Sequence, residues 1–144
     1  MRIEMGKPVG KRILLMMIGL SLLFGGCANE AQQGVPSTTQ SINKISAEEA
    51  KDRMDGEEEI ILLDVRTQEE YDVQHIPNAV LIPLDSIGDK AEAVIPDKEA
   101  VYFVYCRSGN RSEAATVLLM EMGYVNVFDL GGLNHWPYEM VKRQ

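Results

Sequence analysis

The sequence predicts an α/β fold: a single domain with a central parallel sheet and helices on both faces. Residues 60–65 and 101–105 are apolar or aromatic almost throughout and have the length of strands, as parallel strands buried on both faces do. Segments with helical patterns alternate with these runs, which indicates a parallel sheet. Ligands of such sheets bind beyond the carboxyl ends of the strands, so function is expected in the residues that follow each run.

The first two helices have recognisable signals at their N-termini. Ser46 and Glu49 have the spacing of a capping box that opens a helix reaching about residue 54. Thr67 can cap a short helix over residues 68–72. In the sequence, the first of these helices precedes and the second follows the apolar run at residues 60–65, which we expect to be the first long strand.

Two further helices and two further strands follow. A helix that begins at Asp85 or Ser86 reaches about residue 94, and residues 112–122 carry apolar side chains at the spacing of one helix face. The strands are expected over residues 80–82 and 124–128. The glycines at 131 and 132 then turn the chain into a final short helix whose tryptophan fills core.

The strand at residues 101–105 ends in a cysteine, and a polar loop leads from it into the helix predicted to begin at Ser112. Unpaired backbone N–H groups and the positive end of the helix dipole make such a loop an anion cradle. The same field stabilises a thiolate, so we expect Cys106 to be a nucleophile with a lowered pKa. Its polar neighbours speak against burial in an apolar core. The loop residues expected to bind substrate are Arg107, Ser108, Gly109, Asn110, Arg111 and Ser112.

The first 26 residues have the organisation of an export signal. A basic stretch precedes the apolar region Ile13–Phe24, which is shorter than the about 20 residues that span a bilayer. The region is followed by Gly25, Gly26 and Cys27, which resembles a bacterial lipobox, where the cysteine is lipidated and becomes the mature N-terminus. We therefore expect an exported protein, lipid-anchored to the outer face of the cytoplasmic membrane or in the periplasm. A plain secretory signal or an uncleaved anchor are the alternatives.

The chain divides into a signal peptide (1–26), a lipidated cysteine with a flexible tether (27–41), and one domain (42–144). Residues 1–26 hold four basic residues and one acidic residue, so the net charge of −8 becomes −11 once they are removed. Such an acidic domain argues against nucleic acid as a partner and against electrostatic adhesion to anionic lipid. We expect a monomer that contacts the membrane through the lipid on Cys27.

Cysteine usage also bears on the compartment. The chain has two cysteines, and lipidation uses the sulfur of Cys27, so Cys106 has no disulfide partner in a compartment that is usually oxidising. With two histidines and one available thiol, the sequence offers no ligand cluster for a structural metal, and no cofactor is expected.

Four motifs in one order make residues 42–141 resemble the rhodanese family of sulfurtransferases. They are Asp64-Val65-Arg66 with Glu70-Tyr71, His75-Ile76-Pro77-Asn78-Ala79, Cys106 to Ser112, and Gly131-Gly132 with Trp136. The resemblance implies that Cys106 takes a sulfane sulfur from a small anionic donor such as thiosulfate, or from a persulfide, and passes it to cyanide or a thiol. Arg107 and Arg111 are expected to bind the donor or to lower the pKa of the thiol, with a solvated surface charge as the alternative.

The resemblance also implies supporting roles beside the active loop. Asp64 and Arg66 are expected to hold the architecture there, and Arg66 and Glu70, four residues apart, to form a structural ion pair. We expect His75 to be a hydrogen-bonded structural residue, because a loop that activates the thiolate removes the need for a general base. Gln74 stands before His75, where the family usually has glycine.

Two other functions stay open. Cell-cycle dual-specificity phosphatases share this fold and place five residues between cysteine and arginine, whereas Arg111 is already the fifth residue after Cys106. The loop is therefore one residue short for phosphate or arsenate. The domain could instead bind a partner, or sense redox state through a persulfide or sulfenate on Cys106 without turnover.

Overall fold

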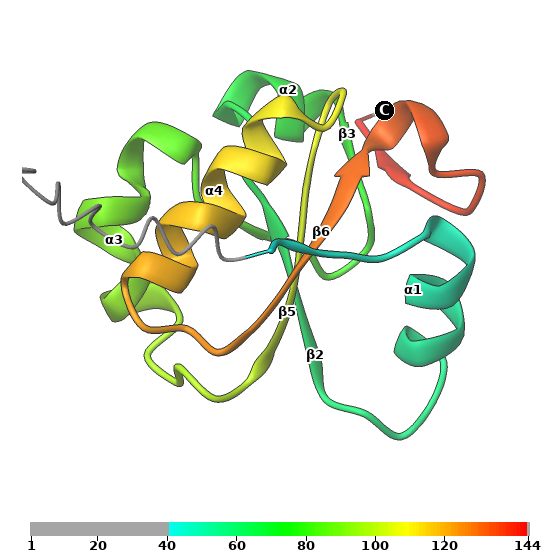
Figure 1. Ribbon diagram of the computed structural model, residues 1–144. Helices are drawn as coiled ribbons and strands as arrows, with labels where there is room; N and C mark the ends of the chain where they lie inside the picture. The colour runs from blue at the N-terminus through cyan, green and yellow to red at the C-terminus, as the bar shows by residue number, and fades with distance from the viewer. Residues whose placement is uncertain (1–40, 144) are drawn as a thin grey trace, which may run out of the picture. The chain divides into compact units, whose positions relative to one another are not determined.

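The two apolar runs of the sequence are the central strands of a five-stranded sheet in the computed structural model, which describes residues 41–143 (Figure 1). The strands of this sheet are β1 (Asn43–Lys44), β2 (Ile60–Asp64), β4 (Val80–Leu81), β5 (Val101–Cys106) and β6 (Asn126–Gly132). Their order is β1-β6-β5-β2-β4, and every neighbouring pair is parallel. The predicted signal peptide, Cys27 and the tether up to residue 40 lie outside the described residues.

Helices cover both faces of the sheet, which confirms the predicted fold class. Helix α1 (Ala47–Met54) lies on one face, and α3 (Ile87–Val94) and α4 (Asn110–Glu121) lie on the other (Figure 1). The buried residues accordingly form two cores. Strand β5 supplies both because successive side chains point to opposite faces: Tyr102, Val104 and Cys106 enter one core, and Phe103 and Tyr105 enter the other.

Helix α4 begins at Asn110, two residues earlier than the sequence predicts. Its N-cap Gly109 has a φ of +107°, a left-handed conformation that glycine adopts without steric cost. This residue turns the chain from β5 almost directly into the helix. The loop proper is therefore residues 107–109, and Asn110 and Arg111 belong to the first turn of α4.

The end of β6 also differs from the prediction. The strand was expected over residues 124–128 with a glycine turn after it, but β6 continues through both glycines. Its register with β5 shifts so that Val104 pairs with Asp129 and Tyr105 pairs with Gly131, which leaves Leu130 as an extra residue in a bulge. Local alternation cannot reveal a bulge, since the pairing partner lies elsewhere in the chain.

A complete capping box opens helix α2 (Gln68–Val73), whereas the sequence predicts one at the start of α1. Thr67 Oγ1 accepts the backbone N–H of Glu70, and the Glu70 carboxylate accepts the N–H of Thr67, at 3.3 and 3.2 Å. At α1 the structure shows the first half of such a box: Ser46 Oγ accepts the N–H of Glu49 at 3.1 Å.

Several short elements complete the domain. Strands β3 (Gln74–His75) and β7 (Val141–Lys142) form an antiparallel pair that is too brief to leave a periodic pattern in the sequence. The 3₁₀ helix η1 (Leu84–Ser86) precedes α3, and η2 (Leu133–His135) lies where a final short helix is predicted. Trp136 is buried, as expected. Within residues 41–143, no helix has the length and apolar character needed to cross a bilayer.

Candidate active site

Cys106 is the last residue of the central strand β5, at the carboxyl edge of the sheet. Its partner in β6 is Gly132, and the preceding residue Tyr105 pairs with Asp64 at the end of β2. The thiol, the Asp64 carboxylate and the end of β6 thus meet at one edge. This is the edge where α/β sheets bind ligands.

The Cys106 thiol lies within a ring of backbone N–H groups. Its Sγ accepts the N–H of Gly109 at 3.1 Å. Burial raises the pKa of the thiol, but hydrogen bonds from backbone N–H groups of the loop and the first turn of α4 lower it by more. The net pKa therefore lies below the ordinary value, and these groups belong to Ser112, Gly109 and Ser108.

The burial of Cys106 corrects the expectation drawn from its polar neighbours. The residue is 0% exposed, and it packs against the core between the sheet and α4. Arg107 and Ser108 are exposed, so the polar residues face solvent while their backbone covers the sulfur. The polar residues after Cys106 therefore indicate that the loop is exposed to solvent, but they do not predict the exposure of the strand residue beneath it.

Ser112 holds the loop in its turned conformation from the first turn of α4. The residue is fully buried, and its hydroxyl donates to the carbonyl oxygen of Gly109 at 2.8 Å. The same oxygen atom lies 3.3 Å from the carbonyl of Gly131 in β6. Asn110, by contrast, is exposed and makes no side-chain hydrogen bond within residues 41–143.

Gly132 supports the loop at the end of β6, a position in the site that the sequence does not predict. A Cβ atom there would lie 2.7 Å from Ser108 Cα and 2.8 Å from the carbonyl oxygen of Arg107. Only glycine fits such a close approach of two backbones. The preceding bulge is held by Asp129, whose carboxylate accepts the N–H of Gly131 at 3.0 Å. The pair of glycines is the available signal, but in the sequence such a pair predicts a turn.

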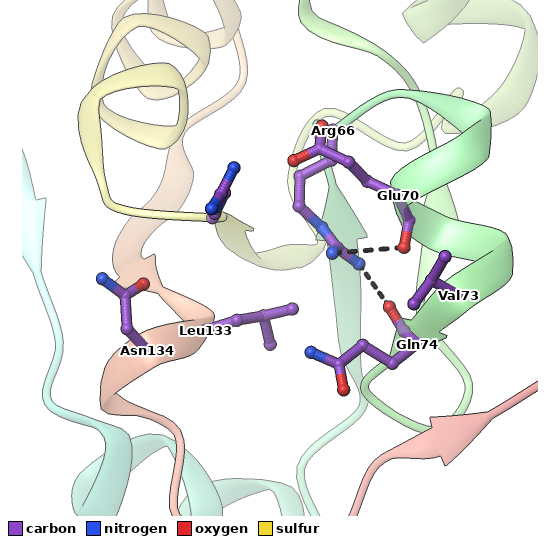
Figure 2. Close-up of a pocket in the computed structure, with 7 residues that line it drawn as sticks. Arg66, Glu70, Val73, Gln74, Leu133 and Asn134 are labelled. Carbon is purple, nitrogen blue, oxygen red and sulfur yellow. Dashed lines mark hydrogen bonds between the residues drawn. The ribbon is translucent and has the colours of Figure 1, made fainter.

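Arg66 pairs with Asp64, not with Glu70 as the sequence analysis expects. Their side chains are 4% and 0% exposed, and Arg66 Nε donates to Asp64 Oδ1 at 2.9 Å. The guanidinium also donates to the backbone carbonyls of Glu70 at 3.4 Å and Gln74 at 2.7 Å (Figure 2). A buried charge pair whose remaining donors are also satisfied ties the end of β2 to the end of α2.

The Glu70 carboxylate pairs instead with Arg111, 41 residues later in the chain. Two hydrogen bonds of 2.6 and 2.9 Å link the two side chains and join α2 to the first turn of α4. The Arg111 guanidinium lowers the pKa of Glu70 to about 2. Arg111 is thus engaged in the structure and contributes its charge near the thiol from within this pair.

A cavity of about 440 Å³ lies outside the loop. It is lined by Arg66, Glu70, Val73, Gln74, Arg107, Leu133 and Asn134, and Figure 2 shows the Leu133 side chain extending into its middle. Arg107 makes no ion pair with any residue in the described part of the chain. The cavity therefore has one uncompensated positive charge beside neutral amides, which suits an anion.

His75 lies apart from this cavity. Its ring stacks on Tyr71 at a centroid distance of 3.8 Å, and Nδ1 is 2.9 Å from the carbonyl oxygen of Tyr71. The histidine lines a separate hollow with Val141 and Lys142. Within residues 41–143, no group of three or more histidine, cysteine or acidic side chains is placed to hold a metal ion.

Comparison with known proteins shows the family to which the domain belongs. Residues 46–138 match the family model described as Rhodanese-like domain. The thiosulfate sulfurtransferase PspE of Escherichia coli is 38% identical over 80 residues, covering 56% of this chain and 77% of that protein. A sulfurtransferase of Allochromatium vinosum is 35% identical over 96 residues, covering 66% of this chain and 88% of that protein.

Solved structures and longer proteins also match. A structure described as a rhodanese with anions from E. coli has a TM-score of 0.55 at 36% identity, covering 58% of this chain and 99% of that chain. Fungal proteins named adenylyltransferase and sulfurtransferase are 38–42% identical, but the chain spans only 19–20% of their length.

Proposed function

The chain belongs to the rhodanese-like domain family of sulfurtransferases, and we propose that it transfers sulfane sulfur through a persulfide on Cys106. The observation that carries this proposal is the ring of backbone N–H groups around a thiol whose pKa is lowered. Such donors stabilise a thiolate before the reaction and the negatively charged terminal sulfur of a persulfide after it. A ring this tight suits one additional sulfur atom better than a tetrahedral phosphate.

The reaction balances without a cofactor. The Cys106 thiolate attacks the sulfane sulfur of thiosulfate, the S–S bond of the donor breaks, and its electron pair leaves on sulfite. The product is a deprotonated persulfide, Cys106–S–S⁻. Cyanide or the thiolate of an acceptor then attacks the outer sulfur, leaves with it as thiocyanate or a new persulfide, and restores the thiolate.

Because Cys106 has no exposed surface while the loop is closed, we propose that the loop opens briefly to admit the donor and closes again on the sulfur, so that the N–H ring is complete when the persulfide forms. Residues 107–109 are the part of the cradle that lies outside both β5 and α4, so they can shift without breaking the sheet or the helix. The cavity beside them would hold the anionic end of the donor while the sulfane sulfur enters the ring. Arg107 belongs to the loop and also lines the cavity, so its guanidinium can pair with that anion.

The test is sulfur uptake by the purified protein. Incubation with thiosulfate should add about 32 Da, one sulfur atom, to the peptide that contains Cys106. Subsequent cyanide should remove this sulfur as thiocyanate with repeated turnover, and Cys106→Ala should do neither. Alkylation of Cys106 should be half-maximal at a pH below about 8.5, the ordinary thiol pKa.

Two results would decide against turnover. A protein that takes up one sulfur but does not pass it to cyanide or a thiol is a carrier or persulfide sensor. A protein that takes up no sulfur and alkylates only above about pH 8.5 contradicts the persulfide mechanism itself. Release of phosphate from an aryl phosphate ester would point to the phosphatase alternative.

We also propose that the domain is exported and held at the membrane by a lipid on Cys27. The basic and apolar N-terminal regions and the Gly25-Gly26-Cys27 sequence support this proposal. An extracytoplasmic location would place a single unpaired thiol in an oxidising environment. The sheltered position of Cys106 beneath its loop is suited to that setting.

A further inference from the structure

One positively charged side chain that lines the cavity has no ion-pair partner among the described residues. Arg66 is paired with Asp64, and the Glu70 carboxylate is paired with Arg111. Arg107 then supplies the remaining formal charge of the lining residues. The other polar side chains there are neutral amides, which can donate hydrogen bonds to an anion without adding charge.

Gln74 is the amide whose position is most tightly fixed. Its backbone N–H donates to the carbonyl of Glu70, and its own carbonyl accepts Arg66 Nη2 at 2.7 Å. Its strand β3 also pairs with β7 through Lys142. The backbone at this position is thus anchored from three directions, one of them through the buried pair at the end of β2.

The side chain of Gln74 is free to act in the cavity. None of the hydrogen bonds formed by residues 41–143 uses its side-chain amide, although the residue is half-buried and lines the cavity. Figure 2 shows the side chain pointing away from α2 and toward Leu133. A fixed backbone that presents an unpaired amide to a cationic cavity is suited to ligand selection.

We propose that Gln74 is a specificity-determining residue whose side-chain amide donates a hydrogen bond to the sulfonate end of the sulfur donor. Arg107 pairs with the same oxyanion from the loop after β5. The inference rests on the proposed sulfur transfer and adds a preference to it. Donors that carry oxygen atoms on the leaving group gain from this contact, whereas donors made of sulfur alone do not.

Two donors separate the contact from the chemistry. With thiosulfate, the Cys106 thiolate takes the sulfane sulfur and sulfite leaves. With the hydrodisulfide anion, HS–S⁻, the thiolate takes the unprotonated sulfur, the S–S bond breaks, and HS⁻ leaves. Both reactions give the same Cys106–S–S⁻ product and conserve charge, but only the first leaving group has oxygen atoms for Gln74 to bind.

The experiment measures both donors with Gln74→Met, which keeps side-chain length but removes the amide. We expect kcat/KM for thiosulfate to fall about fivefold to twentyfold, mainly through KM, because one hydrogen bond to a charged group is lost. The value for hydrodisulfide should change less than about twofold. Gln74→Glu should weaken thiosulfate use further, by repulsion. Gln68→Met, an exposed amide on the adjacent helix outside the cavity, should resemble the wild type for both donors.

Equal losses with both donors in Gln74→Met would overturn the inference, since a structural role would not distinguish them. An unchanged KM for thiosulfate would overturn it as well. If the wild type takes up no sulfur, sulfite titrated into ¹⁵N-labelled protein still tests the contact. Sulfite should shift the Gln74 side-chain amide resonances and bind Gln74→Met at least about fivefold more weakly. Unshifted resonances would exclude the contact independently of turnover.

Discussion

At Gly132 the end of β6 runs against the loop that shelters the Cys106 thiol. The glycine pairs with Cys106 across the sheet, and its missing side chain leaves room for the backbone of Ser108. The loop therefore rests on the sheet by direct backbone contact. Its N–H groups remain aimed at the sulfur because the backbone beneath them is held in place.

We predict that Gly132→Ala lowers the rate of sulfur uptake by Cys106 more than about tenfold. The added methyl would lie 2.7–2.8 Å from backbone atoms of Ser108 and Arg107, and it can be accommodated only if the loop moves off the sheet. Single-turnover mass spectrometry with thiosulfate measures the effect.

Gly88→Ala is the matched control for this variant. Gly88 is an exposed helical residue, and a Cβ there meets no atom within 4 Å. It should keep the wild-type rate and gain stability of about 0.5–1 kcal/mol from helix propensity. If Gly132→Ala reacts as fast as this control, the loop does not depend on close contact with β6.

At the scale of elements, the site is held by a bridge between α2 and α4. Glu70 in α2 and Arg111 in α4 make two hydrogen bonds, and their side chains are 27% and 33% exposed. The same Glu70 also closes the capping box with Thr67, so one carboxylate fixes both the start of α2 and its distance from the loop. Partial exposure to solvent limits the energy of the bridge but not its geometry.

We predict that this bridge makes stability depend on acid. The pKa of Glu70 is about 2 in the folded protein against an ordinary 4.5, so the bridge stabilises fully above about pH 4.5. Its contribution is lost as the pH falls toward 2. Glu70→Gln should cost about 1–2 kcal/mol at pH 7, reduced from the full pKa shift by solvent screening, and should show a shallower loss of stability below pH 4.5.

Urea unfolding between pH 2 and pH 7 checks this prediction. Glu58→Gln is the control because Glu58 forms an exposed pair with Arg53 away from the site. That variant should differ little from the wild type at any pH. A Glu70→Gln profile that runs parallel to the wild type would show that the bridge contributes nothing to acid sensitivity.

At the scale of the whole molecule, the acidic charge opposes contact with an anionic membrane, whereas the expected lipid on Cys27 favours it. The chain carries −8 overall, and its first 26 residues are its most basic part. An acidic domain is repelled by anionic lipid surfaces, so the proposed attachment depends on the N-terminal lipid and not on the charge of the domain. The sheltered thiol and the acidic surface are both properties of the domain alone and do not require the membrane.

We predict that the full chain, expressed in a bacterial host, incorporates labelled palmitate and sediments with membranes. Because acyl chains and not charges would hold it, a wash in 1 M salt should leave it bound. Cys27→Ser should lose the label and the salt-resistant attachment, while Cys106→Ser should keep both. Label that persists in Cys27→Ser would contradict lipidation at this residue.

Much of the fold was predictable because its signals are local. The runs at 60–65 and 101–105 have the length of strands and are rich in β-branched and aromatic residues, and they form the buried strands β2 and β5. A cysteine followed by a short polar loop and a helix likewise predicted that backbone N–H groups surround the thiol. Each of these inferences uses residues within one turn or one strand of each other.

The partners of Arg66 and Glu70 were not predictable in this way. A spacing of four residues favoured a pair between them, but Arg66 turned inward to Asp64 and Glu70 met Arg111. The place of Gln74 in the cavity depends likewise on where β3, η2 and the loop come together. No local pattern contains this information, because it concerns which ends of distant elements share one edge of the sheet.

The amino-acid sequence by itself therefore predicted the two long strands β2 and β5, a candidate nucleophilic thiol and the family, because propensity, hydrophobic periodicity and short motifs act within a few residues. Only the tertiary structure decided that Cys106 is covered, that Gly132 supports its loop, and that an unpaired amide faces the cavity. Burial, close backbone contact and ion pairing depend on packing between elements. That packing exists only once the sheet has brought the ends of β2, β5 and β6 together.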